Sequence, residues 1–256
     1  MSALAAVGRP VLVVTQVTGA MLLGALRAAR AALRFRVPLR ETVRQVERSG
    51  LACLPLTVFA SISVGCIVAV QGMGYVRRYS APEVYGWAAY FSAVREVGPL
   101  LMGLALSARL GALHAAELAA MKATDRVDAL RALGVDVHAV LVAPRILAMP
   151  LAAVLLMAWS DAVSLGSATL FAWAFGDVTP WTTWGSIHKY SLWSDLLLGL
   201  AKAAMYGLFS ALAATAIGMS ADAGADGVGR AVMRAAVVSI VVIVVLNHAL
   251  TVGWAG

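Results

Sequence analysis

The sequence predicts an all-α integral membrane protein, and three observations lead to this fold class. Of the 256 residues, 61% are hydrophobic and 13% are charged, which leaves too little polar surface to cover a soluble domain. Several apolar runs reach the roughly 20 residues that a helix needs to cross a bilayer. The Lys and Arg residues flank these runs without forming a basic face interleaved with aromatic residues, so they indicate a membrane rim rather than a nucleic-acid partner.

Residues 1–48 are expected to form an amino-terminal interfacial helix followed by a basic rim. Residues 10–36 are apolar first and then basic, and their arginines fall partly on one side of a helix. These arginines are Arg27, Arg30, Arg34 and Arg36. A helix that lies in the membrane interface fits this order better than a spanning helix. A short first span from Val11 to Leu26 is the alternative.

Five apolar segments follow, and we treat residues 1–256 as a single domain whose transmembrane bundle covers residues 51–254. The expected spans are at about 51–74, 85–110, 137–175, 194–219 and 231–254. The third is longer than one upright helix needs, so it is either one long tilted helix or a tight hairpin of two. In the first span, Ser61, Gly65 and Ala69 recur every four residues and predict a flat face for close helix packing.

The basic residues predict the orientation of the chain. With a cytoplasmic amino terminus, the inside segments hold most of the basic residues, namely those in 27–48 and 109–145 together with Arg230 and Arg234. The opposite side then holds Arg77, Arg78 and Lys189. The positive-inside rule therefore favours this topology. Trp and Tyr residues between 173 and 193 are typical of the other membrane interface.

The charged stretch HAAELAAMKATDRVDALRALGVD, residues 114–136, separates the second and third apolar runs. As a helix over 113–130 it has one apolar stripe, and its opposite face carries His114, Lys122, Asp125 and Arg126. Leu118 and Met121 lie among the charges, and apolar side chains within a charged patch are typical of a docking surface. Thr124 is a good cap residue, so a break there would give two short helices, and Gly134 is placed to end the stretch. An ordinary amphipathic loop helix is the alternative.

Four stretches together resemble the MlaE (YrbE-type) family, the membrane permeases of MCE-associated ABC transporters. They are REVGPLL at 95–101, ARLGALHAAELAAMKATDRVDALRALGVD at 108–136, APRILAMPL at 143–151 and GADGVGRAV at 224–232. The likeness spans nearly the whole chain in the right order, and the block from Arg95 to Leu151 is highly specific. Departures from the family pattern stand at Ala119, Asp125 with Arg126, Val137 and Asn247.

The resemblance implies a homodimeric permease of the bacterial inner (cytoplasmic) membrane, with a cytoplasmic coupling helix over 112–134. Its partners would be a separate cytoplasmic ABC ATPase, a periplasmic MCE-domain protein and a small cytoplasmic accessory subunit. Its cargo would be phospholipid or a similar hydrophobic molecule. The family motif and the apolar residues within it place the ATPase contact at Glu117, Leu118, Met121, Lys122, Asp125, Arg126 and Asp128.

Ionisable side chains within the expected spans also need a reason, because each costs about 2.5–3.5 kcal/mol on insertion scales. These residues are Arg95, Glu96, Asp161, Asp195 and Lys202. One hypothesis is that Arg95 and Lys202 meet a phospholipid phosphate in a cavity at the dimer interface, with Glu96 balancing their charge. Tyr75 and Tyr79 would then line the mouth of the cavity. The alternatives are an internal ion pair that fixes the helices, and tyrosines that anchor the membrane interface.

The sequence predicts neither an enzyme nor a bound cofactor or metal. Lys122, Lys189 and Lys202 are its lysines and none follows a glycine, so the chain lacks a phosphate loop and ATP is expected on the partner subunit. The histidines show no metal-ligand spacing, and no nucleophile motif is present. Two other functions stay open: a proton-coupled secondary transporter that uses Glu96, Asp161 or Asp195, and a scaffold that recruits partners without transport.

Overall fold

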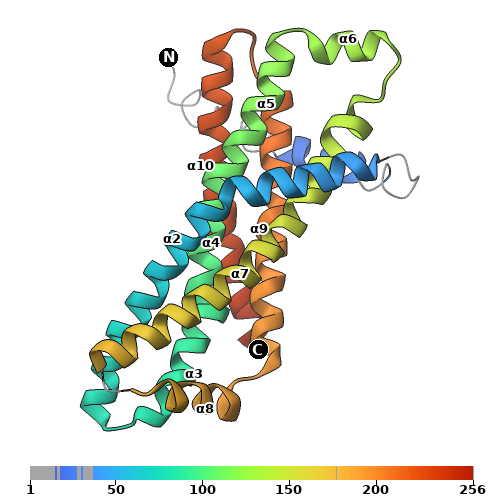
Figure 1. The fold of residues 1–256 in the computed structure, drawn as a ribbon. Helices are drawn as coiled ribbons and strands as arrows, with labels where there is room; N and C mark the ends of the chain where they lie inside the picture. The colour runs from blue at the N-terminus through green and yellow to red at the C-terminus, as the bar shows by residue number, and fades with distance from the viewer. Residues whose placement is uncertain (1–14, 16–17, 28–29, 31–36, 177, 256) are drawn as a thin grey trace, which may run out of the picture. The chain divides into compact units, whose positions relative to one another are not determined.

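The computed structural model describes residues 15, 18–27, 30, 37–176 and 178–255. Within these residues the chain is helical with short connections and contains no strand (Figure 1). Five helices are long and apolar enough to cross a membrane: Leu39–Tyr79, Pro82–Ala123, His138–Gly176, Trp193–Met219 and Ala225–Gly253. The predicted all-α class with five spans is confirmed, and the protein is a multi-pass membrane protein. Arg34 and Arg36 of the predicted interfacial helix lie outside the described residues.

The spans are built from long helices with local changes of winding. The α-helices are α2 (Leu39–Tyr79), α3 (Tyr85–Tyr90), α4 (Val97–Leu106), α5 (Ala112–Ala123), α6 (Arg126–Ala132), α7 (Ala143–Gly176), α8 (Pro180–Tyr190), α9 (Trp193–Met219) and α10 (Ala225–Ala255). A 3₁₀ turn, η1 (Pro82–Val84), precedes α3, and the π-helical segments are η2 (Phe91–Glu96), η3 (Ser107–Gly111) and η4 (His138–Val142). Such π segments occur often at functional sites.

Two helices differ from the expected boundaries. The polar rim before residue 51 belongs to the same helix as the first span, because α2 runs unbroken from Leu39 to Tyr79. Residues 138–176 form one helix, so the hairpin alternative for the third span is wrong. Pro55 and Pro150 lie inside α2 and α7. Membrane helices tolerate proline where neighbouring groups satisfy the freed backbone carbonyls.

The chain forms two compact units, and each unit combines separate stretches of sequence. The first unit contains residues 1–48, 107–150 and 207–242, and the second contains 49–106, 151–206 and 243–256. Helices α2, α7, α9 and α10 each contribute residues to both units. The expectation of a single domain stays a prediction.

In the second unit, the small residues of α2 pack closely against α7, as the four-residue spacing predicts. The Ser61 and Ser160 hydroxyls lie 2.7 Å apart within hydrogen-bonding distance. Gly65 lies directly against the backbone of Ser164, where a Cβ would overlap the carbonyl oxygen. Nearby, the Tyr85 hydroxyl donates to the Ala168 carbonyl at 2.9 Å. Small side chains let the two helix backbones approach, and polar side chains then bond across them.

Gly65→Ala is expected to lower the free energy of unfolding by about 2 kcal/mol, because overpacking a close helix contact forces the backbone apart. Gly166→Ala is the matched control, since a Cβ at Gly166 meets no atom within 4 Å. Unfolding of both variants in detergent would be followed by circular dichroism. Equal stability of the two variants would contradict the close packing at Gly65.

Helix α8 packs on α3 within the second unit, where the two helices lie side by side (Figure 1). It begins at Pro180 after Thr179, whose hydroxyl accepts the Thr182 N–H at 3.2 Å. This is the usual arrangement of a capping residue followed by proline. The Trp87 N–H donates to the Ser186 hydroxyl at 3.0 Å and joins the two helices. Trp181 is 88% exposed, as expected for an aromatic anchor at the membrane interface.

Candidate functional sites: a charged cluster and a coupling segment

The charged residues predicted inside the spans form a cluster around Lys202 in the second unit. The Lys202 side chain is fully buried, and its ammonium donates to the Glu96 carboxylate at 3.0 Å. It also donates to the Arg95 carbonyl and to the Thr251 hydroxyl, each at 2.9 Å. An ammonium has three donors, so Lys202 is satisfied within the protein. For Lys202 the structure therefore favours the internal ion pair over a direct contact with lipid.

Arg95 occupies a different position in the same cluster. Its Nη1 donates to the Asp195 carboxylate at 2.8 Å, and its Nε lies 3.4 Å from the Glu96 carboxylate. The guanidinium also stands over the Phe91 ring, 4.9 Å from its centroid. The Arg95 and Glu96 side chains keep 19% and 25% of their surface exposed. These two residues, unlike Lys202, can meet a ligand without leaving the cluster.

Some members of the cluster were not predicted, and two predicted residues lie outside it. Thr251 bonds both Lys202 and Glu96, and no sequence motif marks it. Asp195 was noted as an intramembrane charge, but its pairing with Arg95 depends on helix packing. Tyr75 and Tyr79 stack on each other on α2, with ring centroids 6.4 Å apart, and both are largely exposed. Their exposure agrees with interfacial anchoring.

Asn247, one of the departures from the family pattern, also has a defined partner. Its side-chain oxygen accepts the Tyr206 hydroxyl at 2.8 Å. Tyr206 is almost fully buried and lies against Gly103, where a Cβ would come within 2.6 Å of the ring. A neutral amide therefore satisfies the tyrosine hydroxyl at this position without adding a charge.

Asp161, unlike Glu96 and Asp195, does not belong to the charged cluster. It is 5% exposed, and neither carboxylate oxygen has a hydrogen-bond partner among the described residues. A buried carboxyl without a partner is costly whether it is charged or neutral. The charged cluster therefore does not account for Asp161.

Asp161→Asn is expected to raise the free energy of unfolding by about 1 kcal/mol, because a neutral amide costs less to bury than an ionised carboxylate without a partner. Asp195→Asn is the matched control and should have the opposite sign, since it removes the partner of Arg95. Thermal unfolding of both variants in the same detergent measures the difference. A loss of stability in Asp161→Asn would mean that the carboxyl has a stabilising partner.

The charged stretch between the second and third spans folds into two short helices, as the break considered at Thr124 predicts. The Thr124 hydroxyl donates to the Ala120 carbonyl at 2.9 Å and closes α5. Asp125 adopts a left-handed conformation with φ 55°, which short polar side chains tolerate better than most. Gly134 ends α6 with φ 74°: its N–H and that of Val135 donate to the carbonyls of Arg131 and Leu130. This is a Schellman motif, as a glycine at that position favours.

The predicted faces of this stretch need correction. His114 was placed on the charged face and Leu118 within the docking patch, but both are buried. In the first unit, α5 packs on α9, and Leu118 lies where a Cβ at Gly218 would come within 2.9 Å of it. The helical periodicity predicted these two faces wrongly because α5 continues a span. Its solvent-exposed face is therefore narrower than that of a helix in a loop. Leu118 supports helix packing and offers no exposed contact.

The remaining predicted residues stay at or near the surface around a hollow of about 440 Å³ in the first unit. Glu117, Met121 and Arg126 line it together with Arg48, Ala120, Thr124 and Arg145. Asp125 and Asp128 are exposed, and Lys122 is half-buried. Methionine and arginine, both present in this lining, are enriched at protein interfaces. The coupling role of these residues stays a prediction.

Glu117 has a structural role that the motif did not reveal. Its carboxylate bonds Arg145 at 3.0 Å and Arg48 at 2.8 Å. The Arg145 side chain is 8% exposed, and its other terminal nitrogen donates to the Leu141 carbonyl at 2.6 Å. Glu117 thereby connects α5 to α7 and α2 within the first unit. Its partners lie far away in sequence, so spacing alone could not identify them.

Comparison with known proteins shows the family to which the chain belongs. The model of the family described as Permease MlaE matches residues 42–252. The chain belongs to the MlaE permease family. As an MlaE permease it is similar to a Rickettsia felis protein named "Probable ABC transporter permease protein", with 30% identity over 96% of this chain and 95% of that protein. It is also similar to the Haemophilus influenzae "Intermembrane phospholipid transport system permease protein MlaE", with 26% identity over 91% of this chain and 88% of that one.

The family likeness extends to plants. The Arabidopsis thaliana "Protein TRIGALACTOSYLDIACYLGLYCEROL 1, chloroplastic" is 26% identical over 86% of this MlaE permease, which spans 63% of the plant protein. The chain is thus a permease of the ABC transporter class.

Proposed function

We propose that this MlaE permease moves phospholipid, or a similar hydrophobic molecule, between the inner membrane and a periplasmic MCE-domain protein. It acts as a homodimer with cytoplasmic amino termini, and a separate ATPase powers it. The observation that carries the proposal is the family match over residues 42–252. The name of the H. influenzae relative, an intermembrane phospholipid transport permease, supports the substrate class.

The ATPase docks on the hollow formed by Glu117, Met121 and Arg126. The supporting geometry is that α5 is continuous with the second candidate span, Pro82–Ala123. A displacement of α5 is therefore passed along one helix to Arg95 and Glu96 at the charged cluster. Rigid secondary elements carry such coupling better than loops. A small cytoplasmic accessory subunit and the MCE protein complete the assembly.

Arg95 and Glu96 contact the lipid headgroup through their exposed surface, while Lys202 and Asp195 hold them in place. A guanidinium is suited to a phosphate because its planar donors match the phosphate oxygens. The neighbouring carboxylate weakens anion binding, which lets the cargo leave. Tyr75 and Tyr79 anchor the interface and do not bind the cargo.

The same geometry leaves fewer carboxyl groups that a proton-coupled mechanism could use. Glu96 and Asp195 are engaged with Lys202 and Arg95, so Asp161 is the remaining intramembrane carboxyl able to exchange a proton. ATP dependence separates the two mechanisms.

The test is reconstitution of the full chain in liposomes with its ATPase, followed by transfer of fluorescent phospholipid to or from the MCE protein. We expect transfer to require ATP and to persist when a protonophore removes the proton gradient. Arg126→Glu should reduce ATPase association, with Arg44→Glu on α2 as the matched control, because Arg44 is exposed and does not line the hollow. Transfer without ATP that stops with the protonophore would replace this proposal with the proton-coupled one.

A further inference from the structure

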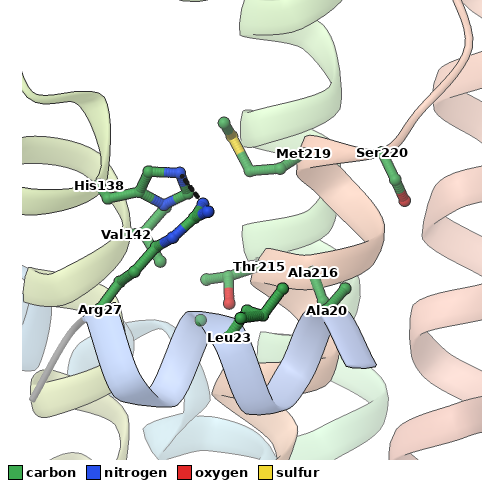
Figure 2. A pocket seen from close by; sticks show the side chains of 10 residues that line it. Ala20, Leu23, Arg27, His138, Val142, Thr215, Ala216, Met219 and Ser220 are labelled. Atoms are coloured by element: carbon green, nitrogen blue, oxygen red, sulfur yellow. Dashed lines mark hydrogen bonds between the residues drawn. The ribbon is translucent and has the colours of Figure 1, made fainter. Parts of the chain in front are cut away.

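A cavity of about 220 Å³ in the first unit lies between the amino-terminal helical segment, residues 18–27, and two spans. Figure 2 shows the segment below the cavity, with η4 and the end of α9 around it. Its lining includes Ala20, Leu23, Arg27, His138, Val142 and Met219. Most of these side chains are apolar, and none is acidic.

Two nitrogen-rich side chains meet at one end of the cavity. Arg27 Nη1 lies 2.8 Å from His138 Nε2, the contact drawn as a dashed line in Figure 2. A guanidinium has no acceptor, so Arg27 donates and Nε2 accepts. An imidazole that accepts in this way leaves the charge of Arg27 uncompensated. The nearby Asp136 carboxylate caps η4 instead, accepting the His138 N–H at 3.0 Å and the Ala139 N–H at 3.3 Å.

The cavity stands at the depth of lipid headgroups. His138 is the first residue of one candidate span, and Met219 is the last residue of another. Leu22, Leu23 and Leu26 on the amino-terminal segment are 63%, 52% and 48% exposed, as expected for a helix lying in the membrane interface. Basic pockets between membrane helices at this depth suit anionic headgroups.

We propose that this cavity binds the phosphate of an anionic phospholipid. Arg27 donates to the phosphate oxygens, and His138 holds the guanidinium toward the cavity. The acyl chains lie outside, along the exposed leucines of the amino-terminal segment. This lipid is a structural ligand and not the transported cargo, so the site goes beyond the proposed function and does not depend on it.

The position of the cavity gives the bound lipid a defined effect. The phosphate joins the amino-terminal segment to η4, which directly follows the coupling stretch in the chain. A lipid that bridges these elements restrains them, and so favours whichever state of the transporter keeps them together.

The test is native mass spectrometry of the full-length protein, titrated with phosphatidylglycerol or with phosphatidylcholine in detergent. Wild type should retain phosphatidylglycerol in preference to phosphatidylcholine. Arg27→Gln should weaken phosphatidylglycerol binding about tenfold, the usual effect of losing a charge-assisted hydrogen bond. Arg30→Gln is the matched control, because Arg30 is the next arginine along the chain and is not among the residues that line the cavity. It should bind like wild type.

A second variant distinguishes the loss of the Arg27 contact with lipid from a displacement of the amino-terminal segment. Ala20→Leu narrows the cavity and keeps both basic side chains, so it should also reduce the bound lipid. Without added lipid, the temperature of unfolding should be the same in Arg27→Gln, Ala20→Leu and wild type. Lipid that persists in Arg27→Gln, or that is lost equally in Arg30→Gln, would overturn the proposal. Displacement of the lipid by millimolar inorganic phosphate would overturn it too, because the cavity would then be a site for free anions.

Discussion

Lys202→Met is expected to lower the free energy of unfolding by about 3–5 kcal/mol, the usual cost of removing one partner from a buried ion pair. The variant leaves the Glu96 carboxylate, the Thr251 hydroxyl and the Arg95 carbonyl without their shared donor. Lys202 is 0% exposed, so water cannot replace the ammonium without opening the helix contacts. Thermal or urea unfolding of the purified protein in detergent measures the loss.

Lys189→Met is the matched control, because Lys189 is an exposed lysine outside the spans and its loss should be nearly neutral. The double variant Lys202→Met with Glu96→Gln should recover part of the stability, since it also removes the unpaired carboxylate. If Lys202→Met alone were as stable as wild type, the cluster would be hydrated and Lys202 would not be held by these partners.

Glu117→Ala is expected to lower the free energy of unfolding by about 3 kcal/mol. This is the lower end of the range for a buried ion pair, because the Glu117 side chain keeps 20% of its surface exposed. The loss leaves the Arg145 guanidinium buried without its carboxylate and separates α5 from α7 and α2. We also expect ATP hydrolysis by the assembled transporter to become insensitive to lipid, because the coupling segment is no longer fixed. Unfolding in detergent and ATPase assays in liposomes test the two effects separately.

Asp128→Ala provides the control for Glu117. Asp128 pairs with Arg131 at 3.0 Å on the same stretch, but both side chains are more than half exposed. Such surface pairs contribute little, so the change should be below about 0.5 kcal/mol. If Asp128→Ala destabilised the protein as much as Glu117→Ala, the effect would belong to the stretch as a whole and not to the buried pair.

The spans, their order and the ends of the charged stretch at 114–136 could be predicted because each depends on local sequence. A long apolar run is helical in a membrane whatever surrounds it, since the backbone must satisfy its own hydrogen bonds there. Gly134 and Thr124 act on the residues beside them, so the end of α6 and the break after α5 could also be identified. The face with Ser61 and Gly65 followed from spacing alone.

The sequence by itself determined which segments are helical, which residues are charged within the spans, and to which family the motifs point. Only the tertiary structure decided which side chains meet: Lys202 with Glu96, Glu117 with Arg145, and Arg27 with His138. These partners lie 28 to 111 residues apart, so helix packing sets their contacts. The tertiary structure also decided that Leu118 is buried. Lipid and protein interior are both apolar, so hydropathy does not distinguish a face that meets lipid from one that meets another helix.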